Sequence, residues 1–235
     1  TMERPNIVFI ICDDLAWGDL ACHGNPVPTH TPHLDAMHAA GTRLTRYCSG
    51  PLCTPARAGI LTGRWHLRTR AFDTYCGRAT LDAGEPTISR TLAAAGYVTG
   101  CLGKWHLGDE IFSQHGFTDR VATEDSYRSF YSEPKKFTQL SEYHDFLIEK
   151  GFTPDSETMG QKVFSRAFEA DLDDHLTKAS FLGDKSVEFI TEHKDVNDPW
   201  MLMVGFLEPH PPHTGPYNDM YDPDSMPTGE SFMKR

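Results

Sequence analysis

The sequence predicts an α/β fold, with a mainly parallel sheet flanked by helices, and its apolar runs are the first observation behind this prediction. Apolar, β-branched runs occupy 6–12, 97–102 and 200–207. Continuous apolar runs are typical of strands that are buried on both faces, as parallel strands are. Helix-like segments separate the three runs. Strands that alternate with helices favour a parallel sheet over an antiparallel one.

Four helices are expected between these strands. Proline favours the first turn of a helix, and glycine favours the position just after its end. These two signals and apolar residues at helical spacing place the expected helices, in chain order, at 31–41, 54–61, 87–95 and 179–193.

The segment 109–176 differs from the rest in composition, because it is rich in Phe, Tyr and acidic residues and has little clear period. We interpret it as an insertion within one domain, 1–235, with local helices over 140–150 and 160–168, that covers the edge of the site. A substrate lid is the functional interpretation, and an ordinary packed helical layer is the alternative. No element is predicted from 211 onward.

Composition and charge exclude several classes of protein. The chain has 235 residues, with 22 basic and 33 acidic side chains and a net charge of −11. Such an acidic balance argues against non-specific binding of nucleic acid. No apolar run approaches the ~20 residues that span a bilayer, so no membrane partner is expected.

The six cysteines form no CxxC pair and are too sparse for a disulfide scaffold. No apolar signal-peptide segment precedes the first strand. We therefore expect a cytoplasmic protein if Met2 is the native start. Otherwise we expect a periplasmic or secreted protein from which the signal peptide was removed.

Ionisable residues follow three predicted strands where each strand ends. They are Asp13-Asp14 after the first strand, Lys104 and His106 after the second, and Glu208 and His210 after the third. Because ligands bind beyond the carboxyl ends of parallel strands, we expect these groups to meet at one edge of the sheet. The adjacent carboxylates suit Ca²⁺ or Mg²⁺. A pair of turn-forming aspartates is the alternative.

Cys53-Thr54-Pro55-Ala56-Arg57 opens the second expected helix. A thiol at a helix N-terminus lies near the positive end of the helix dipole, which is expected to lower its pKa. Arg57 lies one turn further on and is expected to face the same side. An ordinary half-buried cysteine before a helix is the alternative.

Five segments occur in one order: 6–14, Thr31-Pro32-His33-Leu34-Asp35, Cys53-x-Pro55-x-Arg57, Leu61-Thr62-Gly63-Arg64 and Gly103-Lys104-Trp105-His106-Leu107-Gly108. Together they resemble the type I, formylglycine-dependent sulfatases of the alkaline-phosphatase-like superfamily. Pro209-His210-Pro211-Pro212 extends the resemblance, whereas 109–199 matches only in general layout. The resemblance implies the alkaline-phosphatase-like (sulfatase) fold.

The resemblance implies that a maturation enzyme oxidises Cys53 to formylglycine, whose hydrate supplies the nucleophile. Asp13, Asp14 and the modified Cys53 would then bind the metal, with Ca²⁺ the first candidate and Mg²⁺ the second. Arg57 would stabilise the modified side chain, and Lys104 would bind its oxygens and the sulfate.

Two histidines complete the set of residues that the resemblance implies. His106 would be the base that triggers collapse of the diol, and His210 would bind the ester oxygen or protonate the leaving alcohol. His213, three residues further on, is an alternative to His210.

The sequence also departs from the family, whose chains are usually far longer. The remaining metal ligands and a further lysine of the family follow the Pro-His element, and nothing after Pro212 matches them. We expect an amino-terminal portion of the fold, incomplete at its carboxyl end, that is folded but inactive by itself.

Three functions are consistent with these residues. The first is hydrolysis of sulfate esters of a sulfated small molecule or carbohydrate. The second is hydrolysis of phosphonate monoesters or phosphodiesters in the same superfamily. The third is an inactive fragment that acts only in binding. The substrate and the oligomeric state stay open.

Overall fold

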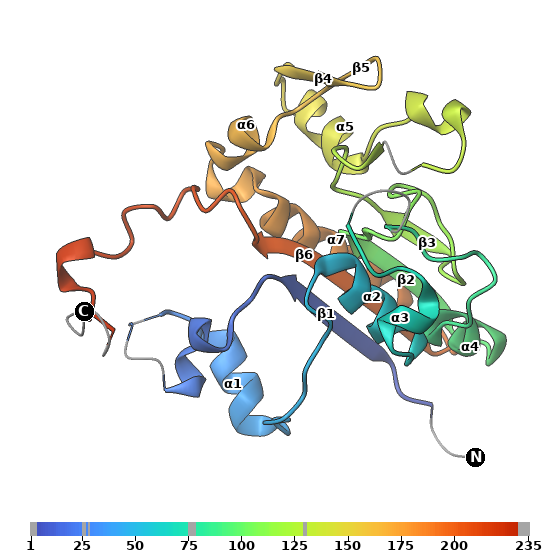
Figure 1. Cartoon of the computed structure of the whole chain (residues 1–235), viewed down its shortest axis with the longest axis horizontal. Coiled ribbons are helices and arrows are strands. Elements are labelled where there is room, and N and C mark those ends of the chain that lie inside the picture. The colour runs from blue at the N-terminus through green and yellow to red at the C-terminus, as the bar shows by residue number, and fades with distance from the viewer. Residues whose placement is uncertain (1–3, 25–26, 28, 75–78, 129–130, 230–235) are drawn as a thin grey trace.

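The computed structural model describes residues 4–24, 27, 29–74, 79–128 and 131–229, and a four-stranded sheet forms its centre (Figure 1). The strands lie in the order β1-β6-β2-β3, and every pair is parallel. Their bounds are β1 (Ile7–Asp13), β6 (Trp200–Pro209), β2 (Val98–Gly103) and β3 (Asp119–Val121). The predicted α/β class and its three strands are confirmed. The three-residue β3 was not predicted, because it is too short to show a period.

Helices pack on both faces of this sheet. Alternate residues of a strand point to opposite faces. Leu202 and Val204 therefore join one core cluster with α7 (Lys178–His193), while Met201 and Met203 join another with α2 (Cys53–Thr62). Figure 1 shows α2 in front of the sheet and α7 behind it. The remaining helices of the first half are α1 (Pro32–Ala40), α3 (His66–Thr69) and α4 (Ile88–Ala94).

The four expected helices are confirmed, and their ends match the signals in the sequence. The Thr87 side chain caps α4 by accepting a hydrogen bond from the Arg90 amide. Gly63 ends α2 with a positive φ of 64°, a conformation that glycine adopts without steric cost. Thr177 caps α7 in the same way as Thr87 caps α4.

One expectation for the first strand is wrong, because β1 is not buried on both faces. Val8 is 48% exposed and Ile10 is 44% exposed. Among the described residues, β1 lies at one edge of the sheet and pairs with β6 alone. The core formed with α7 includes Leu202 and Val204 of β6 but does not extend over this face of β1.

The segment 109–176 contains two helices and a hairpin above the sheet (Figure 1). Its helices are α5 (Glu142–Glu149) and α6 (Arg166–Ala170), and its hairpin joins β4 (Ser156–Thr158) to β5 (Gln161–Val163). The helix expected at 140–150 is confirmed. The one expected at 160–168 is wrong over 160–165, where β5 forms, and only its last three residues lie in α6. Met159 and Gly160 both have positive φ, as the two-residue turn of a tight hairpin requires.

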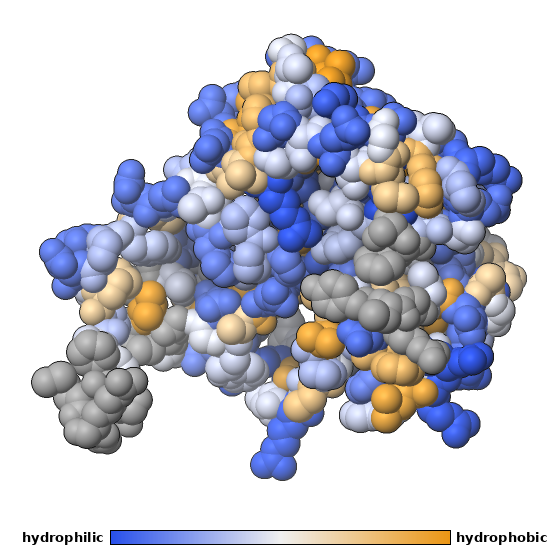
Figure 2. Space-filling view, turned by 45° about the horizontal axis from the view of Figure 1, so that its top comes forward, coloured by the Kyte–Doolittle hydropathy of each residue, from blue (hydrophilic) through white to orange (hydrophobic). Residues whose placement is uncertain are grey.

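Polar and charged residues cover most of the face shown in Figure 2, and its apolar residues lie in scattered groups. In the described part of the chain, no helix has both the length and the apolar character that crossing a membrane requires. Among the described residues after 211, the one helical element is a short 3-10 turn, Pro223–Ser225.

Candidate active site

The carboxyl end of β1 turns two aspartates toward the end of β6. The strand pairing shifts register between Cys12 and Asp13, so that Asp13 lies opposite Pro209. Asp14 then adopts a positive φ of 62°, which turns the chain out of the sheet. The shift and the turn bring Asp13 and Asp14 beside the residue that follows β6, His210.

Lys104, Asp13 and Arg57 form a buried charge cluster at this edge of the sheet. The Lys104 ammonium is fully buried and makes a short ion pair with the Asp13 carboxylate. Arg57 lies 3.5 Å from the other Asp13 oxygen and donates a 2.6 Å hydrogen bond to the Lys104 carbonyl. Burial raises the pKa of Asp13, but the charges of Arg57 and Lys104 outweigh it and hold that pKa below its ordinary value.

Two glycines allow this cluster to form between β2 and β6. A β-carbon at Gly103 would lie 2.2 Å from the Gly205 carbonyl oxygen, and one at Gly205 would lie 2.5 Å from the Lys104 carbonyl oxygen. The Lys104 amide donates a 2.8 Å hydrogen bond to the Gly205 carbonyl in the space that remains. The small residues therefore fix where the Lys104 backbone enters the site.

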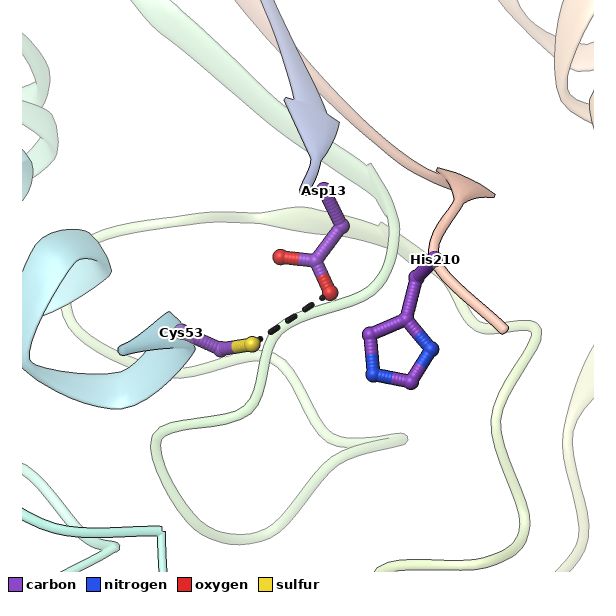
Figure 3. A group of neighbouring side chains, drawn as sticks. All are labelled: Asp13, Cys53 and His210. Atoms are coloured by element: carbon purple, nitrogen blue, oxygen red, sulfur yellow. Dashed lines mark hydrogen bonds between the residues drawn. The ribbon is translucent and has the colours of Figure 1, made fainter. Parts of the chain in front are cut away.

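Cys53 begins α2 and points its sulfur at this cluster (Figure 3). The thiol donates to Asp13 Oδ2 at 3.5 Å, and Lys104 Nζ lies 4.0 Å from the sulfur. The expectation of a lowered thiol pKa is wrong. Burial raises the pKa of Cys53, and the positive charge of Lys104 does not overcome burial and the negative charge of Asp13. Arg57 faces the same side as Cys53, as expected, because both side chains contact Asp13; Arg57 also bonds the Lys104 carbonyl.

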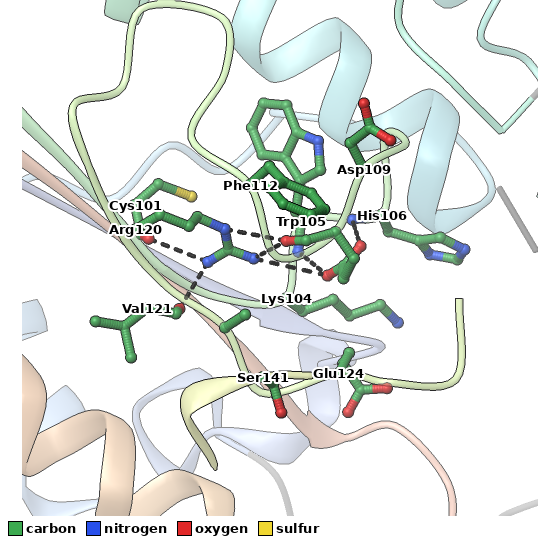
Figure 4. Close-up of polar contacts among 12 residues, drawn as sticks. Cys101, Lys104, Trp105, His106, Asp109, Phe112, Arg120, Val121, Glu124 and Ser141 are labelled. Carbon is green, nitrogen blue, oxygen red and sulfur yellow. Dashed lines mark hydrogen bonds and ion pairs between the residues drawn. The ribbon is translucent and has the colours of Figure 1, made fainter. Parts of the chain in front are cut away.

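The turn after β2 holds His106 through its backbone. Thr54 donates a 2.9 Å hydrogen bond to the His106 carbonyl, which links this turn to α2. The amides of Trp105 and His106, two residues that Figure 4 labels, donate hydrogen bonds of 2.6 and 2.7 Å to the Glu110 carboxylate. The sequence analysis did not predict a role for Glu110. An acidic residue so soon after the Lys104-to-Gly108 motif could have indicated that it supports the motif.

The His106 ring is buried beside positive charge. Burial, followed by the charges of Lys104 and Arg57, lowers the pKa of His106 to about 3. The imidazole is therefore neutral at physiological pH. Tyr127, which the sequence reasoning also missed, stacks on this ring at a centroid distance of 4.0 Å. The spacing of residues in the segment 109–176 did not indicate a role for Tyr127.

His210 lies on the outer side of the site. Its Nδ1 lies 2.8 Å from the Pro211 carbonyl oxygen, and its Nε2 lies 3.9 Å from Asp14 Oδ2. The Asp14 side chain is 53% exposed, unlike the buried Asp13. The alternative histidine, His213, is exposed and lines a pocket beside the site.

Asp13, Cys53 and His210 form a group that has the spacing of metal ligands. One ligand atom from each lies within 4.8 Å of the others. Carboxylate oxygens are the ligands that Ca²⁺ and Mg²⁺ prefer, whereas a thiolate and an imidazole suit softer ions. The aspartates therefore fit a hard cation as they stand. The sulfur fits such an ion only after an oxygen replaces it.

A pocket of about 510 Å³ adjoins the site on the His210 side. It lies between the residues that follow β6, the beginning of α7 and the segment around α6. Its lining is more apolar than polar, and its charged and polar side chains include Arg166, Asp174, Glu208, His213 and Tyr217. A pocket of this volume suits a small-molecule ligand.

The family model described as "Sulfatase" matches residues 5–232. The chain belongs to the sulfatase family. The arylsulfatase A of Homo sapiens is 48% identical over 108 residues, which cover 44% of this chain and 21% of that protein. The match thus spans about a fifth of the length of arylsulfatase A. The resemblance inferred from the sequence motifs is confirmed.

Solved structures share the fold of this sulfatase-family chain. The phosphonate monoester hydrolase SpPMH from Silicibacter pomeroyi gives a TM-score of 0.66 at 22% identity, over 95% of this chain and 46% of that one. A protein solved with its substrate D-glucosamine-2-N,6-O-disulfate gives a TM-score of 0.58 at 23% identity. The match covers 89% of this chain and 35% of that one. These likenesses confirm the predicted alkaline-phosphatase-like fold.

Proposed function

We propose that the protein hydrolyses sulfate esters with a nucleophile that forms at Cys53. The observation that carries this proposal is the position of the Cys53 sulfur, at the start of α2 and within 4.0 Å of both the Asp13 carboxylate and the Lys104 ammonium. The cysteine sits in the Cys53-x-Pro55-x-Arg57 motif, and the chain belongs to the sulfatase family. An anionic ester at this position would meet a buried cation.

The proposal includes the conversion of Cys53 to formylglycine by a maturation enzyme. The hydrated aldehyde would supply one hydroxyl that attacks sulfur and a second whose collapse releases sulfate. The raised pKa of the Cys53 thiol supports this view, because an unmodified thiol would be a poor nucleophile here. Modification would also place oxygen, in place of sulfur, beside Asp13.

We propose Asp13, Asp14 and the modified Cys53 as the residues that hold a divalent metal, with Ca²⁺ the first candidate and Mg²⁺ the second. Their oxygens match the preference of these ions, although a Ca²⁺ site takes ~6–8 oxygen ligands in all. A bound cation would draw electron density from the oxygens around it. Arg57 would hold the Asp13 carboxylate and the Lys104 backbone in place.

Lys104 would bind the sulfate oxygens. Burial lowers its pKa, but Tyr127 and Asp13 outweigh burial and raise it, so the side chain stays charged. A fixed ammonium in a buried site stabilises an anion without reorganisation during the reaction. Lys104 is suited to this role because its side chain is fully buried and already oriented.

Two histidines would move protons. His106 is neutral and accepts a proton, and a bound sulfate would offset the positive charge of Lys104 that keeps its pKa low. His210 would bind the ester oxygen or protonate the leaving alcohol, because it belongs to the metal-ligand group and also lines the adjoining pocket. Acid–base catalysis of this kind contributes ~10²–10⁴-fold.

The adjoining pocket would receive the alcohol part of the substrate, a sulfated small molecule or carbohydrate. Its mostly apolar lining could pack against the body of a ring, and side chains such as Asp174, Tyr217 and Asn218 could bond the hydroxyls of that ring. A structural neighbour that was solved with D-glucosamine-2-N,6-O-disulfate supports a sugar as one substrate class.

The test uses the whole gene product, expressed with a maturation enzyme, and compares its turnover of an aryl sulfate with its turnover of an aryl phosphodiester and an aryl phosphonate. We expect the sulfate to have the highest kcat/KM and Cys53→Ala to remove turnover of all three substrates. Preferred turnover of the phosphorus esters would instead support a phosphonate monoester or phosphodiester hydrolase. Turnover that survives in Cys53→Ala would contradict the proposal.

A further inference from the structure

The buried His106 ring stacks on an aromatic side chain. The ring is 5% exposed, and neither of its nitrogens has a hydrogen-bond partner among the residues that the structure describes. Glu110 and Thr54 hold the backbone of His106 but do not touch its ring. The ring stacks on Tyr127, at a centroid distance of 4.0 Å and an interplanar angle of 22°.

Tyr127 is itself held by Arg166. The Arg166 Nη2 atom, on α6, donates a 2.9 Å hydrogen bond to the Tyr127 hydroxyl. The guanidinium carbon also lies 5.7 Å from the centroid of the Tyr127 ring, and Lys104 Nζ lies 5.5 Å from it. The phenol ring therefore packs between the cations of two separate elements and the imidazole.

A buried ion-pair network anchors this arrangement. Glu124 is fully buried and pairs with Arg166 at 3.3 Å and, through a short contact, with Lys178 on α7. Lys178 also pairs with Glu169 at 2.8 Å. Glu124 is fully buried and needs its cationic partners, so its pair with the partly exposed Arg166 restrains that side chain beside the Tyr127 hydroxyl.

We propose that Tyr127 is the positioning residue for His106: it fixes the plane of the imidazole that accepts the proton, and Arg166 and Glu124 fix Tyr127 in turn. This inference rests on the proposed function, because it concerns the His106 base of that reaction. It gives the segment 109–176 a defined part in the site. Misplacing a reacting group by about 1 Å costs ~10²-fold in rate, so the stack affects kcat more than substrate binding.

Two substitutions separate the ring from the hydroxyl. Tyr127→Leu removes the stack, and we expect kcat for an aryl sulfate to fall ~10–100-fold while KM changes little. Tyr127→Phe keeps the ring, and we expect it to restore most of kcat. The matched control is Tyr131→Leu, which removes a buried ring of the same segment that packs against Phe112 and Phe137 instead of His106. It should leave kcat close to wild type.

A second measurement does not depend on activity. In the NMR spectrum, the ring of Tyr127 should shift the His106 ring protons upfield, and a His106→Gln variant assigns those signals. We expect the upfield shift to persist in Tyr127→Phe and Tyr131→Leu and to disappear in Tyr127→Leu.

The two readouts distinguish the possible failures. A wild-type protein that shows the upfield shift but turns over no sulfate ester would contradict the proposed function, while the stack would stand. A Tyr127→Leu variant that loses the shift but keeps the wild-type kcat would overturn the positioning role. Equal losses of kcat in Tyr127→Leu and Tyr131→Leu would assign the effect to general packing and would overturn it as well.

Discussion

The two sides of the candidate active site differ in how the chain holds them. On the inner side, Asp13, Arg57 and Lys104 are buried and paired with one another. On the outer side, Asp14 is 53% exposed, and its contact with His210 is 3.9 Å long. Buried charges must be paired, so the inner side has one arrangement, whereas water can satisfy the outer groups in several.

Because of this difference, we expect the two sides to have different roles. The inner side presents a fixed cation and a fixed carboxylate to the group at Cys53, as a site that stabilises developing charge requires. On the outer side, Asp14 would bind the metal, and His210 would contact the ester oxygen or the leaving alcohol. Substitutions on the inner side should therefore affect both stability and activity, and those on the outer side activity alone.

Cys53→Ala should have the largest effect on activity, because Cys53 is the proposed nucleophile to which the inner side presents its charges. Loss of a covalent nucleophile costs ~10⁶-fold in kcat, so we expect turnover at the background rate. Stability should change little, because the thiol makes only a 3.5 Å hydrogen bond to Asp13. Activity of the purified variant well above background would contradict the role of Cys53.

Lys104→Met should destabilise the fold, because it leaves the buried Asp13 with Arg57 as its remaining partner at 3.5 Å. Breaking a buried pair costs about 3–5 kcal/mol, which denaturant unfolding measures. The control, Lys185→Met, breaks an exposed pair with Glu188 and should cost at most about 0.5 kcal/mol. Equal losses in the free energy of unfolding for the two variants would show that the buried pair of Lys104 and Asp13 stabilises the fold no more than an exposed pair does.

Paired variants of the two aspartates compare the sides directly. Asp13→Asn should lower both the metal content and the free energy of unfolding, because Asp13 is a proposed ligand and the partner of two buried cations. Asp14→Asn should lower metal affinity but leave the free energy of unfolding nearly unchanged. Elemental analysis and metal titration measure the first property. Full metal affinity in both variants would contradict the ligand assignment.

His210→Asn should reduce kcat ~10²-fold for an ester with a poor leaving group, and less for an aryl sulfate, since an acid matters most when the leaving alcohol needs a proton. His213→Asn is the matched control, because His213 lines the pocket but lies outside the metal-ligand group. A larger loss in His213→Asn would transfer the role to that residue.

His106 should make stability depend on pH. Its pKa falls from 6.5 to about 3 on folding, so between these values the unfolded chain binds a proton that the folded chain does not. The free energy of unfolding should therefore decrease as pH falls, by up to about 1.4 kcal/mol per pH unit from this group. His106→Gln should remove that part of the slope in denaturant titrations between pH 4.5 and 6.5. An unchanged slope would contradict a buried, neutral His106.

The main sheet, the helices around it and the strand-end residues were predictable from the sequence. Apolar runs and helix caps are local signals, and the parallel arrangement then requires Asp13 and Lys104 to meet at one edge. Tyr127 and Glu124 were not predictable, because their roles depend on contacts with residues distant in the sequence, such as Arg166.

Two errors have physical causes that local patterns do not show. The thiol of Cys53 lies at a helix N-terminus, but burial and Asp13 determine the direction of its pKa shift. We expected a helix over 160–168, but Met159 and Gly160, both with positive φ, form the turn of a hairpin whose second strand is Gln161–Val163. In both places the surroundings of a residue decide against its local preference.

The most direct test of the central proposal is the mass of the peptide that contains Cys53, measured after expression with a formylglycine-generating enzyme. We expect the mass loss that accompanies replacement of the thiol by an aldehyde, and labelling of the peptide by an aldehyde-specific hydrazide. The same peptide from Cys53→Ala should show neither. A peptide from active protein that carries only unmodified cysteine would contradict the proposed mechanism.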